Sequence, residues 1–154
     1  MSVHHAERFL PFSDLQMFTL VADVERYPQF VPWWIAARVI DSRPAPAGDG
    51  PDAKIYRTDQ VIGMGPVRLR FTSRTLLVSP RRISVASQGG GPVRDLSLDW
   101  WFDAQPGGCL TRLDMTLDLG SRSLENLLAG MSSEAAVKLV DAFERRAHAL
   151  YQGG

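Results

Sequence analysis

Cysteine and long apolar runs are nearly missing from this chain, and both absences exclude classes of protein. The 154-residue sequence contains one cysteine, Cys109, which excludes an internal disulfide and a multi-cysteine zinc site. No run approaches the ~18 consecutive apolar residues of a membrane-spanning helix. The opening MSVHHAERFLPF lacks the basic region and apolar core of a signal peptide. We therefore expect a cytoplasmic protein that contacts a membrane, if at all, only peripherally at the inner face of the cell membrane.

An excess of basic charge is missing as well. The 17 Lys and Arg residues are balanced by 17 Asp and Glu residues, so the formal net charge is zero. DNA-binding surfaces normally carry a basic excess that displaces counterions, so we expect no DNA partner. The histidines His4, His5 and His148 show no ligand spacing with Cys109 or a carboxylate. The sequence therefore predicts no metal site and no cofactor.

The composition that remains is that of a globular protein. Apolar residues make up 45% of the chain and charged residues 22%, which is typical of a folded domain rather than a disordered segment. The length fits one domain of ordinary size. We therefore treat residues 1–154 as a single domain.

The beginning of the chain predicts one strand and two short helices. Residues 3–9 form the expected strand. Ser13 starts a capping-box pattern, with a glutamine three residues later, and apolar residues then recur at helical spacing, which predicts a helix over 14–22. A second short helix is expected over 24–30, and Pro32 prevents it from continuing.

Alternating apolar and polar residues predict six further strands. The first covers 34–42, and the others are centred on the inward-facing sets Tyr56–Ile62, Val67–Thr75, Ile83–Val85, Leu96–Phe102 and Leu113–Leu119. Strict alternation means that one sheet face is buried and the other is wet, as in an antiparallel sheet. Arg68, Arg70 and Arg74 fall on the outer face of their strand.

The hydrophobic period then changes from two to about 3.6, which predicts a long amphipathic helix over 124–150, bent near Gly130. Its apolar stripe consists of Leu124, Leu128, Met131, Ala135, Leu139, Phe143, Ala147 and Leu150. Small residues near its middle (Ala129, Gly130, Ala135 and Ala136) either leave room for a guest molecule or allow close packing on the sheet.

This order of elements predicts an α+β fold. A seven-stranded antiparallel sheet with one apolar face must have that face covered. Of the predicted helices, only the C-terminal one is long enough to cover it. We therefore expect the sheet to curve around this helix in a helix-grip shape, with space between the two.

Four stretches of the sequence resemble a known family. They are YPQFVPW (27–33), LVADV (20–24), GPVRDLSLDWWF (91–102) and AFERRA (142–147). They resemble the coenzyme Q-binding, RatA-like branch of the START-like, polyketide cyclase superfamily. The resemblance implies a helix-grip fold with a hydrophobic tunnel that carries ubiquinone, or a similar isoprenoid lipid, in support of respiration without transforming it. It also implies two alternatives: a toxin that acts on ribosomes, and an aromatic polyketide cyclase or dehydratase.

The candidate ligand-binding residues fall into three sets, and no catalytic residue is predicted. Aromatic and proline residues after the short helices either gate the tunnel or form a small local core: Tyr27, Phe30, Pro32 and Trp33, with Trp33 and its neighbour Trp34 not both expected to be buried. Residues expected between sheet and helix are either tunnel walls or ordinary core: Phe71, Leu96, Trp100, Met115, Leu128, Met131 and Phe143. Finally, Tyr56 and Gln60, with Thr58, either face inward as donors to quinone carbonyls or are exposed because the strand register is reversed.

Overall fold

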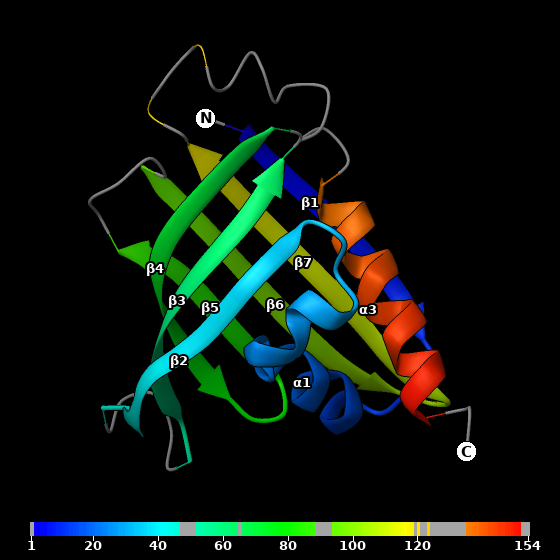
Figure 1. Cartoon of the computed structure of the whole chain (residues 1–154). Helices are drawn as coiled ribbons and strands as arrows, with labels where there is room; N and C mark the ends of the chain where they lie inside the picture. The colour runs from blue at the N-terminus through cyan, green and yellow to red at the C-terminus, as the bar shows by residue number, and fades with distance from the viewer. Residues whose placement is uncertain are drawn as a thin grey trace.

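A curved antiparallel sheet with helices against its concave face forms the fold in the computed structural model (Figure 1). The structure describes residues 2–46, 52–64, 66–88, 94–118, 120, 123 and 135–151. The predicted α+β class and the curved sheet of the helix-grip shape are confirmed.

The elements follow one another in the predicted order. They are β1 (Ser2–Leu10), α1 (Asp14–Ala22), η1 (Val24–Gln29), β2 (Trp34–Pro44), β3 (Lys54–Met64), β4 (Val67–Val78), β5 (Arg82–Gln88), β6 (Asp95–Gln105), β7 (Gly108–Asp118) and α3 (Ala135–Tyr151). The strands form one seven-stranded sheet in the order β1-β7-β6-β5-β4-β3-β2. The segment expected as a second α-helix is a 3-10 helix, with Pro28 inside it. Proline has no backbone N–H to donate, which favours this short, tighter turn over a regular helix.

The capping box predicted at Ser13 is present at the start of α1. The Gln16 backbone N–H donates to the Ser13 hydroxyl over 3.0 Å, and the Gln16 side chain accepts from the Ser13 backbone N–H over 2.9 Å. Both bonds satisfy N–H groups that would otherwise lack a partner at a helix start.

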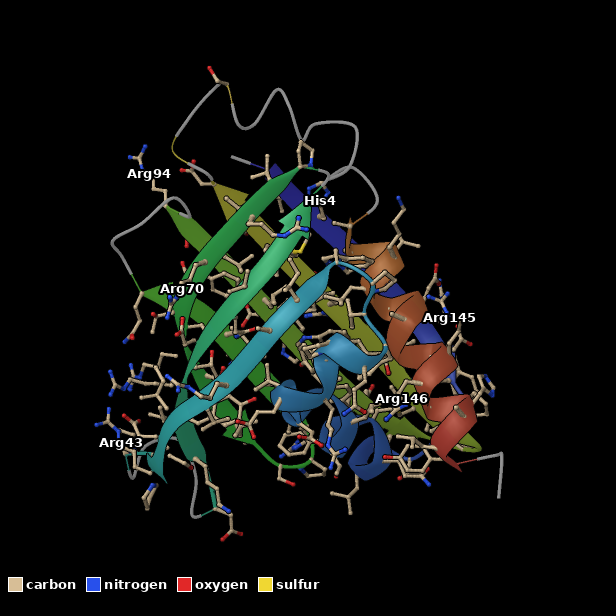
Figure 2. All side chains as sticks on the ribbon, viewed as in Figure 1. His4, Arg43, Arg70, Arg94, Arg145 and Arg146 are labelled. Carbon is tan, nitrogen blue, oxygen red and sulfur yellow. The ribbon has the colours of Figure 1, made fainter. Side chains whose placement is uncertain are left out.

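The alternation read from the strands matches their burial. Every second residue is buried along β7 and along β6 from Leu96 to Phe102, whereas Arg68, Arg70 and Arg74 are exposed on β4. Figure 2 shows Arg70 on the side of the sheet away from α3. The predicted inward position of Leu119 lies outside the described residues.

The register of β3 is the inward one. Tyr56 pairs with Thr75, Thr58 with Ser73, and Gln60 with Phe71 on β4. Paired residues in an antiparallel ladder share a face, and all six of these side chains are buried. The alternative of a reversed, exposed register is therefore wrong.

Helical cover of the sheet is shared, which differs from the expectation of a single covering helix. The described part of α3 packs on β1 and β7, and α1 packs against β5 and β6 as well as α3. A helix is about 10 Å wide and strands lie ~4.8 Å apart, so one helix covers only about two strands. Residues 124–134, including the expected bend near Gly130, lie outside the described residues.

An ion-pair cluster fixes α3 to the first strand. The Arg8 guanidinium on β1 contacts Asp141 and, over 2.8 Å, Glu144 on α3. The hydrogen bonds that Arg8 donates to the two carboxylates raise the pKa of its guanidinium. No helix in the described parts of the chain is both long and apolar enough to cross a membrane.

Replacing the cap residue tests the local origin of α1. Ser13→Ala is expected to lower the free energy of unfolding by about 1 kcal/mol, because it removes the acceptor for the Gln16 N–H. The measurement is urea denaturation followed by circular dichroism. Thr19→Ala, at an exposed position on the same helix, is the control and should cause no comparable loss. Equal losses in the two variants would contradict the capping assignment.

Candidate functional site

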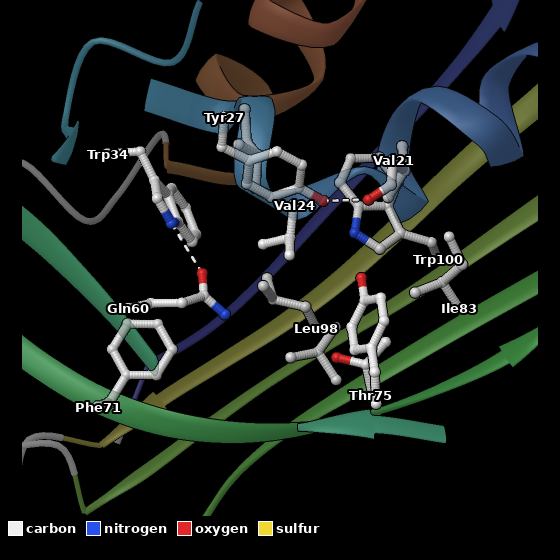
Figure 3. A pocket seen from close by; sticks show the side chains of 13 residues that line it. Val21, Val24, Tyr27, Trp34, Gln60, Phe71, Thr75, Ile83, Leu98 and Trp100 are labelled. Carbon is white, nitrogen blue, oxygen red and sulfur yellow. Dashed lines mark hydrogen bonds between the residues drawn. The ribbon is translucent and has the colours of Figure 1, made fainter. Parts of the chain in front are cut away.

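A small pocket lies between the concave face of the sheet, the α1–η1 segment and α3 (Figure 3). Its lining residues are Val21, Val24, Tyr27, Trp34, Tyr56, Gln60, Phe71, Thr75, Ile83, Val85, Leu98, Trp100 and Leu139. Its free volume is about 10 Å³, which is room for roughly one water molecule. The open hollow expected from the sequence is therefore closed along this part of the sheet.

Aromatic packing around Phe143 closes the space. Phe143 on α3 is completely buried. Its ring lies 5.1 Å from the rings of Tyr27 and Phe30 and 5.2 Å from that of Trp100, in edge-to-face arrangements. Such contacts between aromatic rings stabilise a core beyond their buried area. Phe143 thus joins α3, η1 and β6 in one cluster.

Side chains from β2, β3 and β4 form a polar network in the otherwise apolar wall of the pocket. The Trp34 indole N–H donates to Gln60 Oε1 over 2.8 Å (Figure 3). The Gln60 amide donates in turn to Thr58 Oγ1 over 2.7 Å and to Ser73 Oγ over 3.1 Å. Gln60 is only 4% exposed, and a buried amide needs such partners because an unpaired one costs about 1–3 kcal/mol.

Two tyrosine hydroxyls bind the last carbonyls of α1. The Tyr27 hydroxyl donates to the Val21 carbonyl, and the Tyr56 hydroxyl donates to the Ala22 carbonyl over 2.8 Å. Carbonyls in the last turn of a helix have no partner within the helix. Burial raises the pKa of both phenols, well above the ordinary value in Tyr27. Both side chains therefore remain protonated donors at neutral pH.

The predicted site residues are distributed unevenly around this pocket. Those that line it are Tyr27, Tyr56, Gln60, Phe71 and Trp100. Buried or half-buried residues that pack in the same core without lining it are Phe30, Leu96, Met115 and Phe143. Pro32 is exposed and Trp33 is half-buried, and neither lines the pocket. Leu128 and Met131 lie outside the described residues.

Trp34 lines the pocket, although the predicted set of site residues contained its neighbour Trp33 instead. Trp34 is 6% exposed and starts β2, so its side chain turns inward, while Trp33 belongs to the preceding turn. The sequence indicated that the two tryptophans are not both buried. It held no signal for which one would face inward, because that depends on where β2 begins.

The pocket contains no strong acid or base among its described lining residues. No group of His, Cys, Asp and Glu suited to a metal ion occurs in the described ranges. What the lining offers is an apolar surface with neutral hydrogen-bond donors from Trp34, Gln60, Tyr56 and Tyr27. Such a lining suits a mostly apolar molecule with a few carbonyl acceptors.

Comparison with known proteins agrees with this fold. Residues 10–144 match the family described as polyketide cyclase / dehydrase and lipid transport. The chain belongs to this family. The match covers all of the lining residues, and the START-like fold expected from the sequence is thereby confirmed.

Three individual proteins are similar to this chain. A ribosome association toxin RatA from Pseudomonas aeruginosa is 32% identical over 98% of this chain and 99% of the relative. The mitochondrial coenzyme Q-binding protein COQ10 homolog B from Xenopus laevis is 24% identical over 94% of this chain and 57% of the relative. The solution structure of the 18 kDa protein CC1736 from Caulobacter crescentus superposes with a TM-score of 0.77 at 28% identity, covering 99% of both chains.

Burial of the two phenols predicts a loss of stability in alkali. Above the ordinary phenol pKa of about 10, the unfolded chain releases protons that Tyr27 and Tyr56 keep in the folded state. Stability is therefore expected to be fully present below about pH 10 and to fall as pH rises further. Urea midpoints measured between about pH 9 and about pH 11 should fall less steeply in the double variant Tyr27→Phe/Tyr56→Phe. Equal slopes in the two proteins would rule out this origin.

Proposed function

We propose that this protein binds a lipophilic quinone, ubiquinone or a similar isoprenoid lipid, on the concave face of its sheet and carries it without chemical change. The observation that carries the proposal is the polar network centred on Gln60, buried in an otherwise apolar wall. The lipid-transport description of the family and the coenzyme Q-binding relative support the same class of ligand.

The network has the hydrogen-bonding character that a quinone ring needs. A quinone presents two carbonyl oxygens, which only accept hydrogen bonds. The pocket supplies neutral donors in the Trp34 indole, the Gln60 amide and the Tyr56 hydroxyl. Each of these donors is now bonded to the protein, so a quinone carbonyl would replace a protein acceptor at little net change in hydrogen bonding.

Binding requires the pocket to open, because its present volume of about 10 Å³ is far smaller than a quinone ring. The aromatic side chains that pack around Phe143, between α3 and the sheet, would have to move apart. Affinity would come from the apolar surface that the ligand buries, at ~25 cal/mol per Å². Apolar contacts between side chains would then be replaced by apolar contacts with the ligand, and the polar network would orient the quinone ring.

The same lining supports carriage rather than catalysis. A cyclase or dehydratase needs a general base close to the substrate. The titratable groups of the described lining are Tyr27 and Tyr56, and burial raises the pKa of both. A phenol with a raised pKa is a poor base at neutral pH, so it serves as a hydrogen-bond donor instead.

Tryptophan fluorescence provides a direct test. An ubiquinone analogue with a decyl tail is expected to quench the emission of Trp34 and Trp100 saturably. Gln60→Leu should weaken binding about ten-fold, because it removes the amide donor and leaves the Trp34 N–H without an acceptor. Asp59→Ala, which changes the residue immediately before Gln60 on the outer side of β3, is the control and should bind the analogue normally.

The second readout is lipid extraction of the purified protein followed by mass spectrometry. Protein made in quinone-rich cells is expected to carry quinone. Absence of quinone from the extract, together with no saturable quenching by the decyl analogue, would refute the proposal.

Association with ribosomes is a second candidate, and the whole-length similarity to RatA favours it. The outer face of β4 carries the arginines that such a surface would use. Arg70 is paired with Asp59 over 2.5 Å, and elsewhere on this face Arg57 pairs with Asp41 and Arg82 lies 3.4 Å from Asp99. This alternation of charges weakens the attraction for an RNA backbone, so we place this candidate second.

Co-sedimentation with purified ribosomal subunits tests the second candidate. If it is right, the double charge reversal Arg68→Glu/Arg74→Glu should abolish co-sedimentation at low salt, because it opposes contact with phosphates. Arg81→Glu, in the exposed turn between β4 and β5, is the matched control and should retain it. Failure of the unaltered protein to co-sediment would eliminate this candidate.

A further inference from the structure

A wide groove lies where the ends of β2, β3 and β4 meet α1, at the lower end of the sheet in Figure 1. Its volume is about 760 Å³, which lies within the ~300–1,000 Å³ of typical small-molecule sites. Buried or half-buried apolar side chains form its floor: Phe18, Ala22, Ala53 and Leu77. Exposed polar and charged residues stand at its rim: Ser42, Arg43, Asp52, Lys54 and Ser79.

The strand register makes this groove a direct continuation of the interior pocket. Lys54 pairs with Leu77, Tyr56 with Thr75, and Thr58 with Ser73. Alternate residues of a strand share a face, so these pairs are three consecutive steps along the concave side of β3 and β4. The first step belongs to the groove, the second lines the pocket, and the third belongs to the Gln60 network.

One contact joins the linings of the two spaces, and we call it the partition. It is the contact between Tyr56, which lines the pocket, and Ala22, which lines the groove. The Tyr56 hydroxyl donates to the Ala22 carbonyl over 2.8 Å. Opening this contact breaks one hydrogen bond between two neutral groups and moves the buried Tyr56 ring out of its packing.

We propose that the groove holds the apolar tail of the ligand whose ring occupies the interior pocket, and that the Tyr56–Ala22 contact opens to let the tail pass. This inference rests on the proposed function and adds where the chain of the ligand lies. The pocket, at about 10 Å³, has no room for a tail, whereas the groove, at about 760 Å³, has ample room.

The division of chemistry between the two spaces gives the orientation of the ligand. The donors suited to carbonyl oxygens lie on the pocket side of Tyr56, in the network of Gln60 and Trp34. The groove floor is apolar and suits an isoprenoid or alkyl chain. A ligand that lay the opposite way round would place its carbonyls on the apolar floor at Leu77 and Phe18 or beside the exposed polar groups of the rim, where water competes for their hydrogen bonds.

A series of ligands with different tails tests the inference in the full-length protein. The probes are 2,3-dimethoxy-5-methylbenzoquinone, which has no tail, and its decyl derivative. Ser42→Trp fills the groove from an exposed position, so the fold should survive. This variant is expected to weaken binding of the decyl probe about ten-fold, which corresponds to losing roughly 60 Å² of apolar contact. Binding of the tail-less probe should not change. Ile40→Trp, on the same strand and also exposed, is the matched control and should affect neither probe.

The possible outcomes separate the inference from the function on which it rests. If the unaltered protein binds both probes and Ser42→Trp weakens the decyl probe no more than Ile40→Trp does, the tail does not lie in the groove, while quinone binding stands. If the unaltered protein binds neither probe, quinone binding itself fails, and the groove assignment fails with it.

The partition is tested through rates. Tyr56→Phe removes the hydroxyl that binds Ala22, so stopped-flow quenching should show the decyl probe associating several-fold faster than with the unaltered protein. The tail-less probe, added in parallel, measures any general loosening of the pocket. An association rate for the decyl probe that does not rise relative to the tail-less probe would overturn the role of this contact.

Discussion

The burial of one apolar sheet face under short helical segments is the constraint on which the rest of this molecule depends. Seven strands present more apolar surface than a single helix covers, and the described part of α3 rests on β1 and β7 while α1 covers β5 and β6. Phe143 lies where these covers meet and contacts rings from η1 and from β6. Removing its ring would leave a cavity that no neighbouring element can readily fill.

Polar groups inside such a core are tolerated only when they are paired, and here they pair with one another. Thr58, Gln60 and Ser73 form a network on β3 and β4, closed by the Trp34 indole from β2. The two tyrosines satisfy the end of α1 in the same way. The core thus contains neutral donors. The carbonyl of a bound molecule could accept their hydrogen bonds in place of a protein acceptor, without any charge being buried.

The closed pocket and the open groove give this member of the family two spaces of opposite character on one concave face. The pocket has buried hydrogen-bond donors but almost no free volume, whereas the groove has a large volume and an apolar floor. A carrier of an amphiphilic lipid needs both properties together. The hydrogen bond between Tyr56 and Ala22 joins them, and in the proposed carriage it would break and re-form as a ligand exchanges.

The sequence alone determined the order of elements, the capping box at Ser13 and the inward faces of the strands other than β3, because these follow from local periodicity and local hydrogen bonds. The sequence left the inward face of β3 open, and its pairing with β4 decided it. The sequence also predicted five of the lining residues, Tyr27, Tyr56, Gln60, Phe71 and Trp100. Only the tertiary structure decided that Trp34 rather than Trp33 faces inward, that helical cover is shared, and that the interior is filled around Phe143. These outcomes depend on side-chain packing between segments far apart in the chain, and a pattern of apolar residues specifies which face is buried but not how tightly it closes.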